Sequence, residues 1–312
     1  MKHTLKITLI ILAMFLATQF IGLYVVNYYS PVKVVEGNVT NVEAPNLPMG
    51  LETPEVSEPR EYNQMFISII ISFVIAISLL FLLTKFKSEF ILKLWFFIVV
   101  IIALVISFQV ITSSVHIEKI IFKIPIIATL VALPLAFLKV YKGNLIVHNI
   151  TELMIYPGIA SVFVPILNIW TIIALLVVIS AYDIWAVWHS GIMQKMAKYQ
   201  IRKLKVFAGF FVPYISKKVR MRIRRMKKSE LKKKGVRANV AILGGGDVIF
   251  PIIAAGVMLK TLGIVPALLV ILGAVAGLSY LLFLAEKKKF YPAMPFISAG
   301  IFIAIGISYL IF

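Results

Sequence analysis

The sequence predicts an all-α, polytopic membrane protein with nine transmembrane helices. Of its 312 residues, 61% are hydrophobic and 14% are charged, whereas a soluble domain carries about 25% charged residues. The chain therefore has too little polar surface to face water on all sides. Apolar runs near the ~20 residues that cross a bilayer recur nine times, at 5–29, 65–84, 90–112, 120–138, 149–166, 168–190, 238–259, 263–285 and 292–312.

The first of these runs favours an uncleaved anchor over a signal peptide. It extends from about Leu5 to about Tyr29, longer than the 7–15 apolar residues of a signal peptide. The fourth and fifth runs are the least regular, because they contain Pro125, Pro134 and Pro157.

Charge sets the expected orientation, since cytoplasmic loops carry an excess of Lys and Arg. The segment 30–63 holds six of the 13 acidic residues and several prolines, which predicts an irregular external loop. Basic residues mark the loops after the second, fourth, sixth and eighth helices, at Lys85, Lys87, Lys93, Lys139, Lys142, 195–237 and 287–289. All of these fall on one side if the N-terminus is cytoplasmic and the C-terminus external. We expect a multi-pass protein of the cell membrane.

Three regions follow from this pattern: 1–190 with six helices, a basic cytoplasmic loop at 191–237, and 238–312 with three helices. The net charge of +19 does not indicate a nucleic-acid partner, because 17 of the 32 basic residues lie in the loop, where they suit anionic lipid. Within it, the apolar stretch Val206–Tyr214 is interpreted as an interfacial helix, with a movable gate as the alternative.

The only two aspartates, Asp183 and Asp247, lie inside predicted helices. An acid at the centre of a transmembrane helix costs about 2.5–3.5 kcal/mol, so each needs a functional reason. Asp183 precedes the end of the sixth helix by seven residues, and Asp247 follows the start of the seventh, near Asn239, by eight. Both would lie roughly 10–12 Å below the cytoplasmic face. The other acids, Glu152 among them, are expected in loops or at helix ends.

Two facing carboxyl groups in a low dielectric hold one proton between them and titrate as a unit. Aspartic proteases use this state to activate water and polarise the scissile carbonyl. Transporters also carry buried acids, so a proton-coupled transporter or a cation leak stays open on chemistry alone. The chain has no Cys and no zinc-binding HExxH motif, and its four His are scattered, so neither a metal nor another cofactor is expected.

The motifs around the aspartates separate these alternatives. Tyr182-Asp183 and Gly244-Gly245-Gly246-Asp247 resemble the YD and GxGD motifs of the presenilin and signal peptide peptidase family of intramembrane proteases. Pro292-Ala293-Met294 is similar to the family's PAL motif, with Met for Leu. We choose it over the literal PAL at 266–268, which begins a helix on the external side.

The resemblance implies an intramembrane aspartyl endopeptidase that hydrolyses peptide bonds within transmembrane segments or signal peptides. Asp183 and Asp247 would be catalytic, and substrate would contact the remaining motif residues, Tyr182, Gly244, Gly245, Gly246, Pro292, Ala293 and Met294. Prepilin peptidases share GxGD but lack the other two motifs. The compact chain is expected to act without partner subunits, in the lipid bilayer, as a single chain or a homo-oligomer.

The three glycines before Asp247 have two physical interpretations. Each Gly inside a helix costs about 1 kcal/mol relative to Ala, so the run needs a compensating role. It either permits close packing of helices or leaves the backbone open to pair with an extended substrate.

Overall fold

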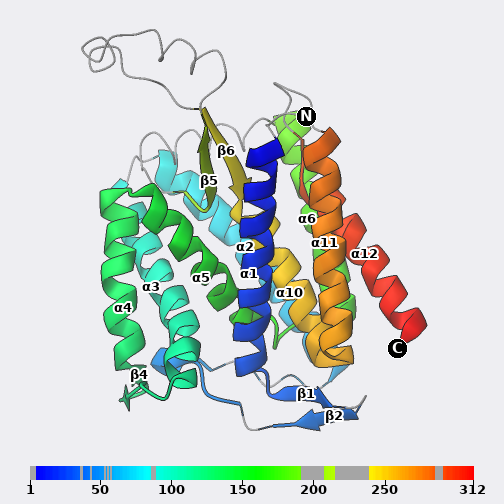
Figure 1. Ribbon diagram of the computed structural model, residues 1–312, viewed down its shortest axis with the longest axis horizontal. Coiled ribbons are helices and arrows are strands. Elements are labelled where there is room, and N and C mark those ends of the chain that lie inside the picture. Colours follow the sequence, from blue (N-terminus) through cyan, green and yellow to red (C-terminus); the bar gives the residue numbers. More distant parts are fainter. Residues whose placement is uncertain are drawn as a thin grey trace.

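The computed structural model describes residues 5–35, 38–42, 44–52, 54, 56, 58–85, 89–190, 207–214, 239–284 and 291–312. Over these ranges it contains nine α-helices: α1 (Leu5–Tyr29), α2 (Pro59–Lys85), α3 (Glu89–Ser114), α4 (Ile126–Phe137), α5 (Leu145–Phe163), α6 (Ile169–Trp185), α10 (Gly245–Leu262), α11 (Ile264–Leu284) and α12 (Met294–Ile311). Eight are long and apolar enough to cross a membrane. The start of α1 and the end of α12 lie at opposite ends of the bundle (Figure 1).

The one remaining α-helix of the described residues, α4, is shorter than the predicted span of 120–138. Residues 120–125 form a small hairpin of β3 (Ile120–Ile121) and β4 (Ile124–Pro125) instead. The Glu118 carboxylate accepts hydrogen bonds from the Ile127 and Ala128 amides, which satisfies orphan donors of the first helical turn. The helix therefore begins only at residue 126 and continues into a π-turn, η2 (Leu138–Lys142).

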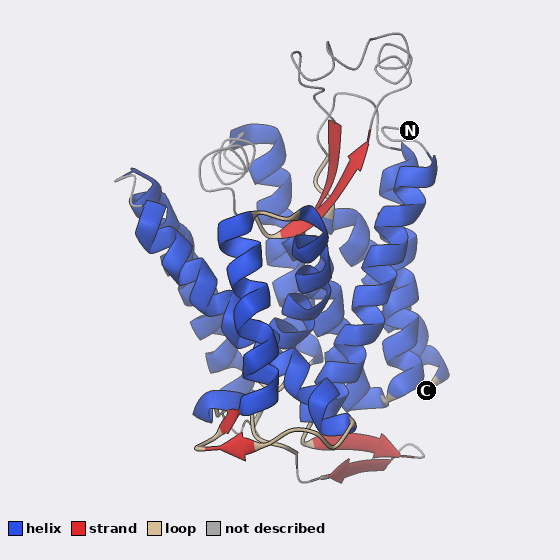
Figure 2. Ribbon diagram, turned by 60° about the vertical axis from the view of Figure 1, so that its left-hand side comes forward, coloured by secondary structure: helices blue, strands red, loops and turns tan. Residues whose placement is uncertain are grey.

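Short antiparallel strand pairs lie at both ends of the bundle (Figure 2). At one end, β1 (Val32–Val35) pairs with β2 (Asn38–Asn41), and a 3₁₀ turn, η1, follows at Pro48–Gly50. The predicted irregular loop 30–63 is thus partly regular. At the other end, β5 (Gly209–Tyr214) pairs with β6 (Asn239–Gly244) in register from Gly209–Gly244 to Tyr214–Asn239.

The interpretation of Val206–Tyr214 as an interfacial helix was wrong. Six of these residues form β5, and its partner β6 shows the burial alternation of a strand: Ala241 and Leu243 are buried, whereas Val240 and Ile242 are exposed. Gly209 has a φ of +151°, a backbone conformation that residues other than glycine rarely adopt. Sheet pairing, which local apolar composition does not reveal, decides this segment.

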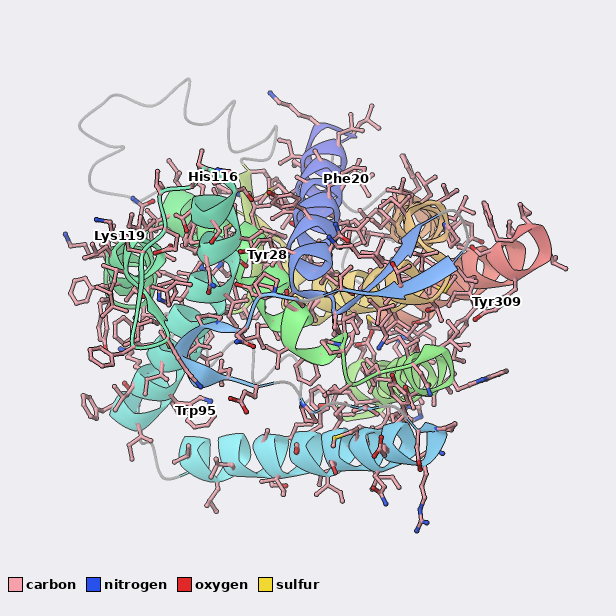
Figure 3. All side chains as sticks on the ribbon, turned by 90° about the horizontal axis from the view of Figure 1, so that it is seen from below. Phe20, Tyr28, Trp95, His116, Lys119 and Tyr309 are labelled. Atoms are coloured by element: carbon pink, nitrogen blue, oxygen red, sulfur yellow. The ribbon has the colours of Figure 1, made fainter. Side chains whose placement is uncertain are left out.

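The core is centred on α10, which packs against α1, α5, α6, α11 and α12. Its small residues let these helices approach: a Cβ on Gly256 would come within 2.6 Å of Val164. By contrast, α2 lies at the rim of the bundle (Figure 3) and contacts mainly α3 and α6. The segments that carry the two aspartates are thus near the best-packed part of the molecule.

The closest helix pair is α11 with α12. A Cβ on Gly300 would overlap the Gly273 carbonyl oxygen, and one on Gly277 would overlap that of Phe296. Small residues allow this approach of two backbones in a membrane protein. The packing holds the start of α12 beside α6, with which α12 is also in contact.

Candidate active site

Asp183 lies on α6 and is buried, just before the helix continues into the π-turn η3 (Ala186–Ser190). Its Oδ2 accepts a hydrogen bond of 3.1 Å from the Met294 amide, and the Ala293 amide is also in reach of the carboxylate. Met294 is the first residue of α12. The unpaired N–H groups and dipole of a helix N-terminus attract an anion, so the start of α12 stabilises the Asp183 carboxylate.

Asp247 lies in the first turn of α10, three residues after the N-cap Gly244. Its carboxylate accepts a hydrogen bond from the Gly244 amide, the reciprocal contact that an acid at this position makes in a capping box. The prediction that α10 begins near Asn239 was wrong, because 239–244 is β6. The strand leads into the bundle before α10 begins (Figure 1), so Asp247 lies within the bundle despite being at a helix start.

The structure brings the two aspartates together. The helices that carry them, α6 and α10, are in contact, and α12 touches both. The two carboxyl groups are near enough that the charge on Asp183 acts on Asp247. Two carboxyl groups on neighbouring helices therefore lie within electrostatic range of each other, and the Asp183 carboxyl group lies at the N-terminus of a third helix.

Family comparison shows which family the chain belongs to. Residues 38–312 match the family model described as signal-peptide peptidase, presenilin aspartyl protease. The chain belongs to this family. It is accordingly a presenilin-type intramembrane aspartyl protease and an integral, multi-pass membrane protein.

Solved structures support the fold of this presenilin-type protease. A presenilin family intramembrane aspartate protease in a C222 crystal form is similar with a TM-score of 0.57 at 17% identity, over 98% of this chain and 99% of that one. A structure of a presenilin family intramembrane aspartate protease in space group P2 gives a TM-score of 0.58 at 17% identity, over 99% of this chain and 98% of that one. No curated protein matches the chain. At this identity the likeness concerns the fold.

The glycines of the GxGD motif have three different environments in this presenilin-type chain. A Cβ on Gly244 would lie 3.2 Å from the Asp247 Oδ2, and one on Gly245 would lie 2.9 Å from the Tyr156 hydroxyl. Gly246 is exposed, and the nearest atom to its Cβ position is on Phe250, 3.6 Å away. Close packing thus explains Gly245, whereas Gly246 leaves the backbone open.

The PAL-like residues lie where α12 begins. Pro292 and Met294 are buried and Ala293 is partly buried, and the Met294 amide contacts Asp183 directly. The literal PAL at 266–268 lies in the first turns of α11, after the whole of α10, and so roughly 25 Å further along the bundle than Asp247.

Tyr182 is placed differently from its neighbour Asp183. Its side chain is 46% exposed, and its ring centroid lies 6.2 Å from that of Trp185. Asp183 is only 6% exposed. Tyr182 therefore lies on the outer side of α6, while Asp183 faces the packed interior.

Sequence reasoning missed a polar group behind the site. Glu152 was expected at a helix end and Lys139 in a cytoplasmic loop, yet both side chains are 1% exposed and form an ion pair. The fifth helix was predicted to start at 149, whereas α5 starts at Leu145, which places Glu152 two turns inside it. The i,i+4 spacing of His148, Glu152 and Tyr156 was the signal available.

Proposed function

We propose that Asp183 and Asp247 are the catalytic pair, and that they hydrolyse peptide bonds within transmembrane segments through an activated water molecule. One observation carries the proposal: the two aspartates lie on neighbouring helices within electrostatic range of each other, and each carboxyl group accepts a backbone hydrogen bond at a helix N-terminus. These bonds fix both carboxyl groups before substrate arrives. Such preorganisation lowers the cost of reaching a transition state.

In the proposed reaction the pair holds one proton. The ionised carboxylate removes a proton from water as its oxygen attacks the carbonyl carbon of the substrate, and the protonated carboxyl donates to the carbonyl oxygen. The resulting gem-diol collapses when the C–N bond breaks. The nitrogen takes the proton that water gave up, and one gem-diol hydroxyl returns its proton to the carboxylate that had donated to the carbonyl oxygen. No covalent intermediate or metal ion takes part.

Single-span proteins and remnant signal peptides are the proposed substrates. A helical segment hides its peptide bonds, so it must unwind locally, and its freed backbone groups need partners where water is scarce. Within the part of the chain that the structure describes, β6 pairs with β5 alone. We infer that the other edge of β6, the exposed Gly246 and the Pro292-Ala293-Met294 turn receive the unwound segment, with Tyr182 at its margin.

Incubation of the purified chain with a labelled single-span substrate tests the activity. We expect two complementary fragments, and inhibition by an aspartyl transition-state analogue, without added subunits. Proton flux in proteoliposomes without any cleavage would instead support the transporter alternative.

Substrate unwinding has its own test. Gly246→Leu should weaken turnover at unchanged thermal stability, because the position is open yet adjacent to Asp247. Pro292→Ala should do the same by loosening the turn before α12. Helix-breaking residues near the scissile bond of the substrate should recover part of the rate. If such substrates gain nothing in any enzyme form, unwinding does not limit the reaction.

The proposed orientation has a cytoplasmic N-terminus and an external C-terminus. The start of α1 and the β5–β6 pair lie at the same end of the bundle (Figure 1), which would put the site toward the cytoplasm. A cysteine at Ser229 should be labelled only in permeabilised cells, and one at Ser57 in intact cells. Both positions lie outside the described residues. The reverse pattern would invert the orientation.

A further inference from the structure

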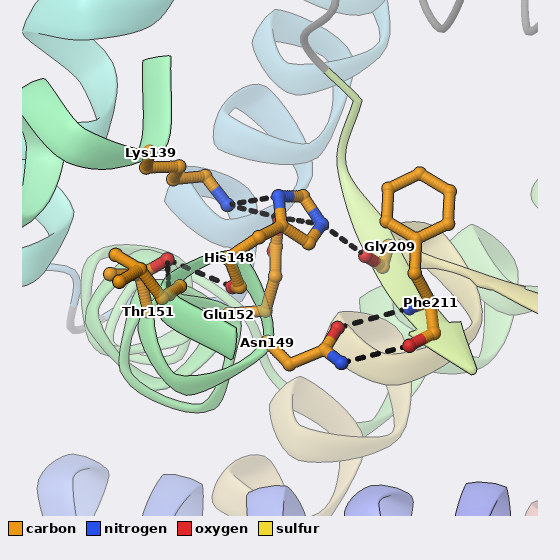
Figure 4. A network of polar contacts seen from close by, with 8 residues as sticks. Lys139, His148, Asn149, Thr151, Glu152, Gly209 and Phe211 are labelled. Carbon is orange, nitrogen blue, oxygen red and sulfur yellow. Dashed lines mark hydrogen bonds and ion pairs between the residues drawn. The ribbon is translucent and has the colours of Figure 1, made fainter. Parts of the chain in front are cut away.

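Three ionisable side chains lie together in the interior, between η2 and α5 (Figure 4). The Lys139 Nζ donates to Glu152 Oε1 at 2.5 Å and lies 3.3 Å from His148 Nδ1. Lys139 and Glu152 are almost fully buried. Burying such a pair is costly even when it is paired, and inside a membrane protein such groups mark functional positions. The proposed reaction has no step for them.

The hydrogen bonds of this cluster fix the state of His148. A lysine ammonium group only donates hydrogen bonds, so the Nδ1 beside it accepts. In a neutral imidazole the other nitrogen then carries the hydrogen. The Nε2–H therefore donates to the Gly209 carbonyl oxygen, 2.7 Å away. The ion pair thus aims one donor at the first residue of β5.

Asn149 makes a second contact with the same strand. Its side-chain nitrogen donates to the Phe211 carbonyl oxygen at 2.8 Å, and its oxygen accepts from the Phe211 amide at 3.0 Å. The side-chain amide acts as a neighbouring strand does in a ladder. Because Gly209 and Phe211 are two residues apart, both contacts lie on the edge of β5 that faces away from β6.

The strand held in this way leads to Asp247. Gly209 is paired with Gly244, and the Gly245 amide donates to the Ala208 carbonyl oxygen at 3.2 Å. One turn after Glu152, Tyr156 packs against the backbone of Gly245. One face of α5 thus contacts β5 and the turn that carries Asp247.

We propose that Lys139, His148, Asn149 and Glu152 form a positioning cluster that fixes the outer edge of β5 and, through β5–β6 pairing, the Gly244–Asp247 turn. The proposal rests on the catalytic role proposed for Asp247. It assigns to α5 the task of keeping the two aspartates in register. It also explains why only β6 has an edge left to accept substrate, since α5 occupies the edge of β5.

Substitutions at His148 and Asn149 test the cluster. His148→Leu and Asn149→Leu remove the contacts to β5 without stranding the Lys139–Glu152 pair. His148→Gln keeps an N–H at about the reach of Nε2 and should rescue. The matched control is Glu118→Leu, which removes another set of side-chain-to-backbone hydrogen bonds that holds α4, away from the aspartates.

Kinetic constants and backbone hydrogen exchange are measured for each variant and compared with its thermal stability. In the Leu variants we expect kcat to fall about tenfold or more, since misplacing a catalytic group by about 1 Å costs up to ~10²-fold, with a smaller change in KM. Hydrogen exchange should accelerate in 207–214 and 239–247. His148→Gln should recover most of both, and Glu118→Leu should lower the melting temperature while leaving kcat and these amides unchanged.

The outcomes separate this proposal from the catalytic one. Faster exchange in β5 and β6 with unchanged kcat would overturn the positioning role, as would equal losses in His148→Gln and His148→Leu. Unchanged hydrogen exchange in both Leu variants would show that the positioning cluster does not hold β5, whatever the value of kcat. A wild-type chain that never cleaves would contradict the catalytic proposal, while the exchange data would still decide whether α5 holds the strand.

Discussion

Each of the two aspartates accepts a hydrogen bond from a backbone amide, but the two donors lie at very different distances along the chain. Asp247 accepts from Gly244, three residues before it, whereas Asp183 accepts from Met294, 111 residues after it. In each case the donor belongs to a helix N-terminus. The hydrogen bond that orients the Asp247 carboxylate is therefore local to its own turn, whereas the bond that orients the Asp183 carboxylate depends on how α6, α11 and α12 pack. Disturbances of the two sites should differ in where they originate.

The largest predicted effect, loss of kcat on replacing an aspartate, should be the same for Asp183 and Asp247. Asp183→Asn and Asp247→Asn each keep an oxygen that accepts the backbone hydrogen bond, but neither can carry the proton that the reaction needs. We expect each to lower kcat by on the order of 10³-fold or more, with melting temperatures near the wild type. Retained cleavage in either variant would remove that aspartate from the catalytic pair.

The second prediction disturbs the turn that carries Asp247 at its contact with α5. A Cβ at Gly245 would press on the buried Tyr156, and such overpacking costs about 1–3 kcal/mol. Gly245→Ala should therefore lower both the melting temperature and kcat, the latter about tenfold. Tyr156→Phe in the same chain removes the nearest atom and should restore part of each.

Gly246→Ala is the matched control for this turn, because its added methyl meets only Phe250 at 3.6 Å. Thermal stability should be unchanged or slightly raised, since Ala is the better helix former. Equal losses of melting temperature in Gly245→Ala and Gly246→Ala would mean that flexibility of the turn, and not contact with α5, is what the glycines provide.

The same contrast explains what the sequence could predict. Nine helices and the two aspartates were accessible because hydrophobic length and a charge inside an apolar run are local properties. The GxGD and PAL-like motifs, which predict the site, are local sequence patterns in the same way. The start of α10 was misplaced by six residues, since 239–244 is apolar enough for a helix, and its strand conformation arises from pairing with 209–214.

The polar group of α5 was missed for a related reason. With the predicted helix boundaries, which differ from the observed ones by a few residues, Lys139 falls in a loop and Glu152 at a helix end, where charged residues are ordinary. Their burial is visible only when η2 and α5 are placed side by side. Contacts of this kind join two segments, and the sequence of neither segment predicts that it will contact the other.

The third prediction disturbs the tertiary side. The Ser180 hydroxyl donates to the Ser298 hydroxyl at 3.0 Å and links α6 to α12 one turn from Asp183. Hydrogen bonds between membrane helices are worth about 0.6 kcal/mol on average. Ser298→Ala should therefore lower kcat only about threefold, with Asp247 and the β5–β6 pair unaffected in hydrogen exchange. A loss as large as that of Gly245→Ala would show that α12 is held mainly by this one contact.

The smallest effect concerns the departure from the PAL motif. Met294 supplies Asp183 with a backbone N–H, and its side chain is 3% exposed. Leucine has a similar volume and the same amide, and swaps of this kind in a core usually cost less than about 1.5 kcal/mol. Met294→Leu should leave kcat within about twofold of the wild type, because the donor to Asp183 does not depend on the side chain. Measured against the same substrate, a large gain would mean that methionine holds the start of α12 loosely in this protein. A large loss would mean that the side chain itself shapes the site, and the tertiary anchor of Asp183 would then extend beyond the backbone of α12.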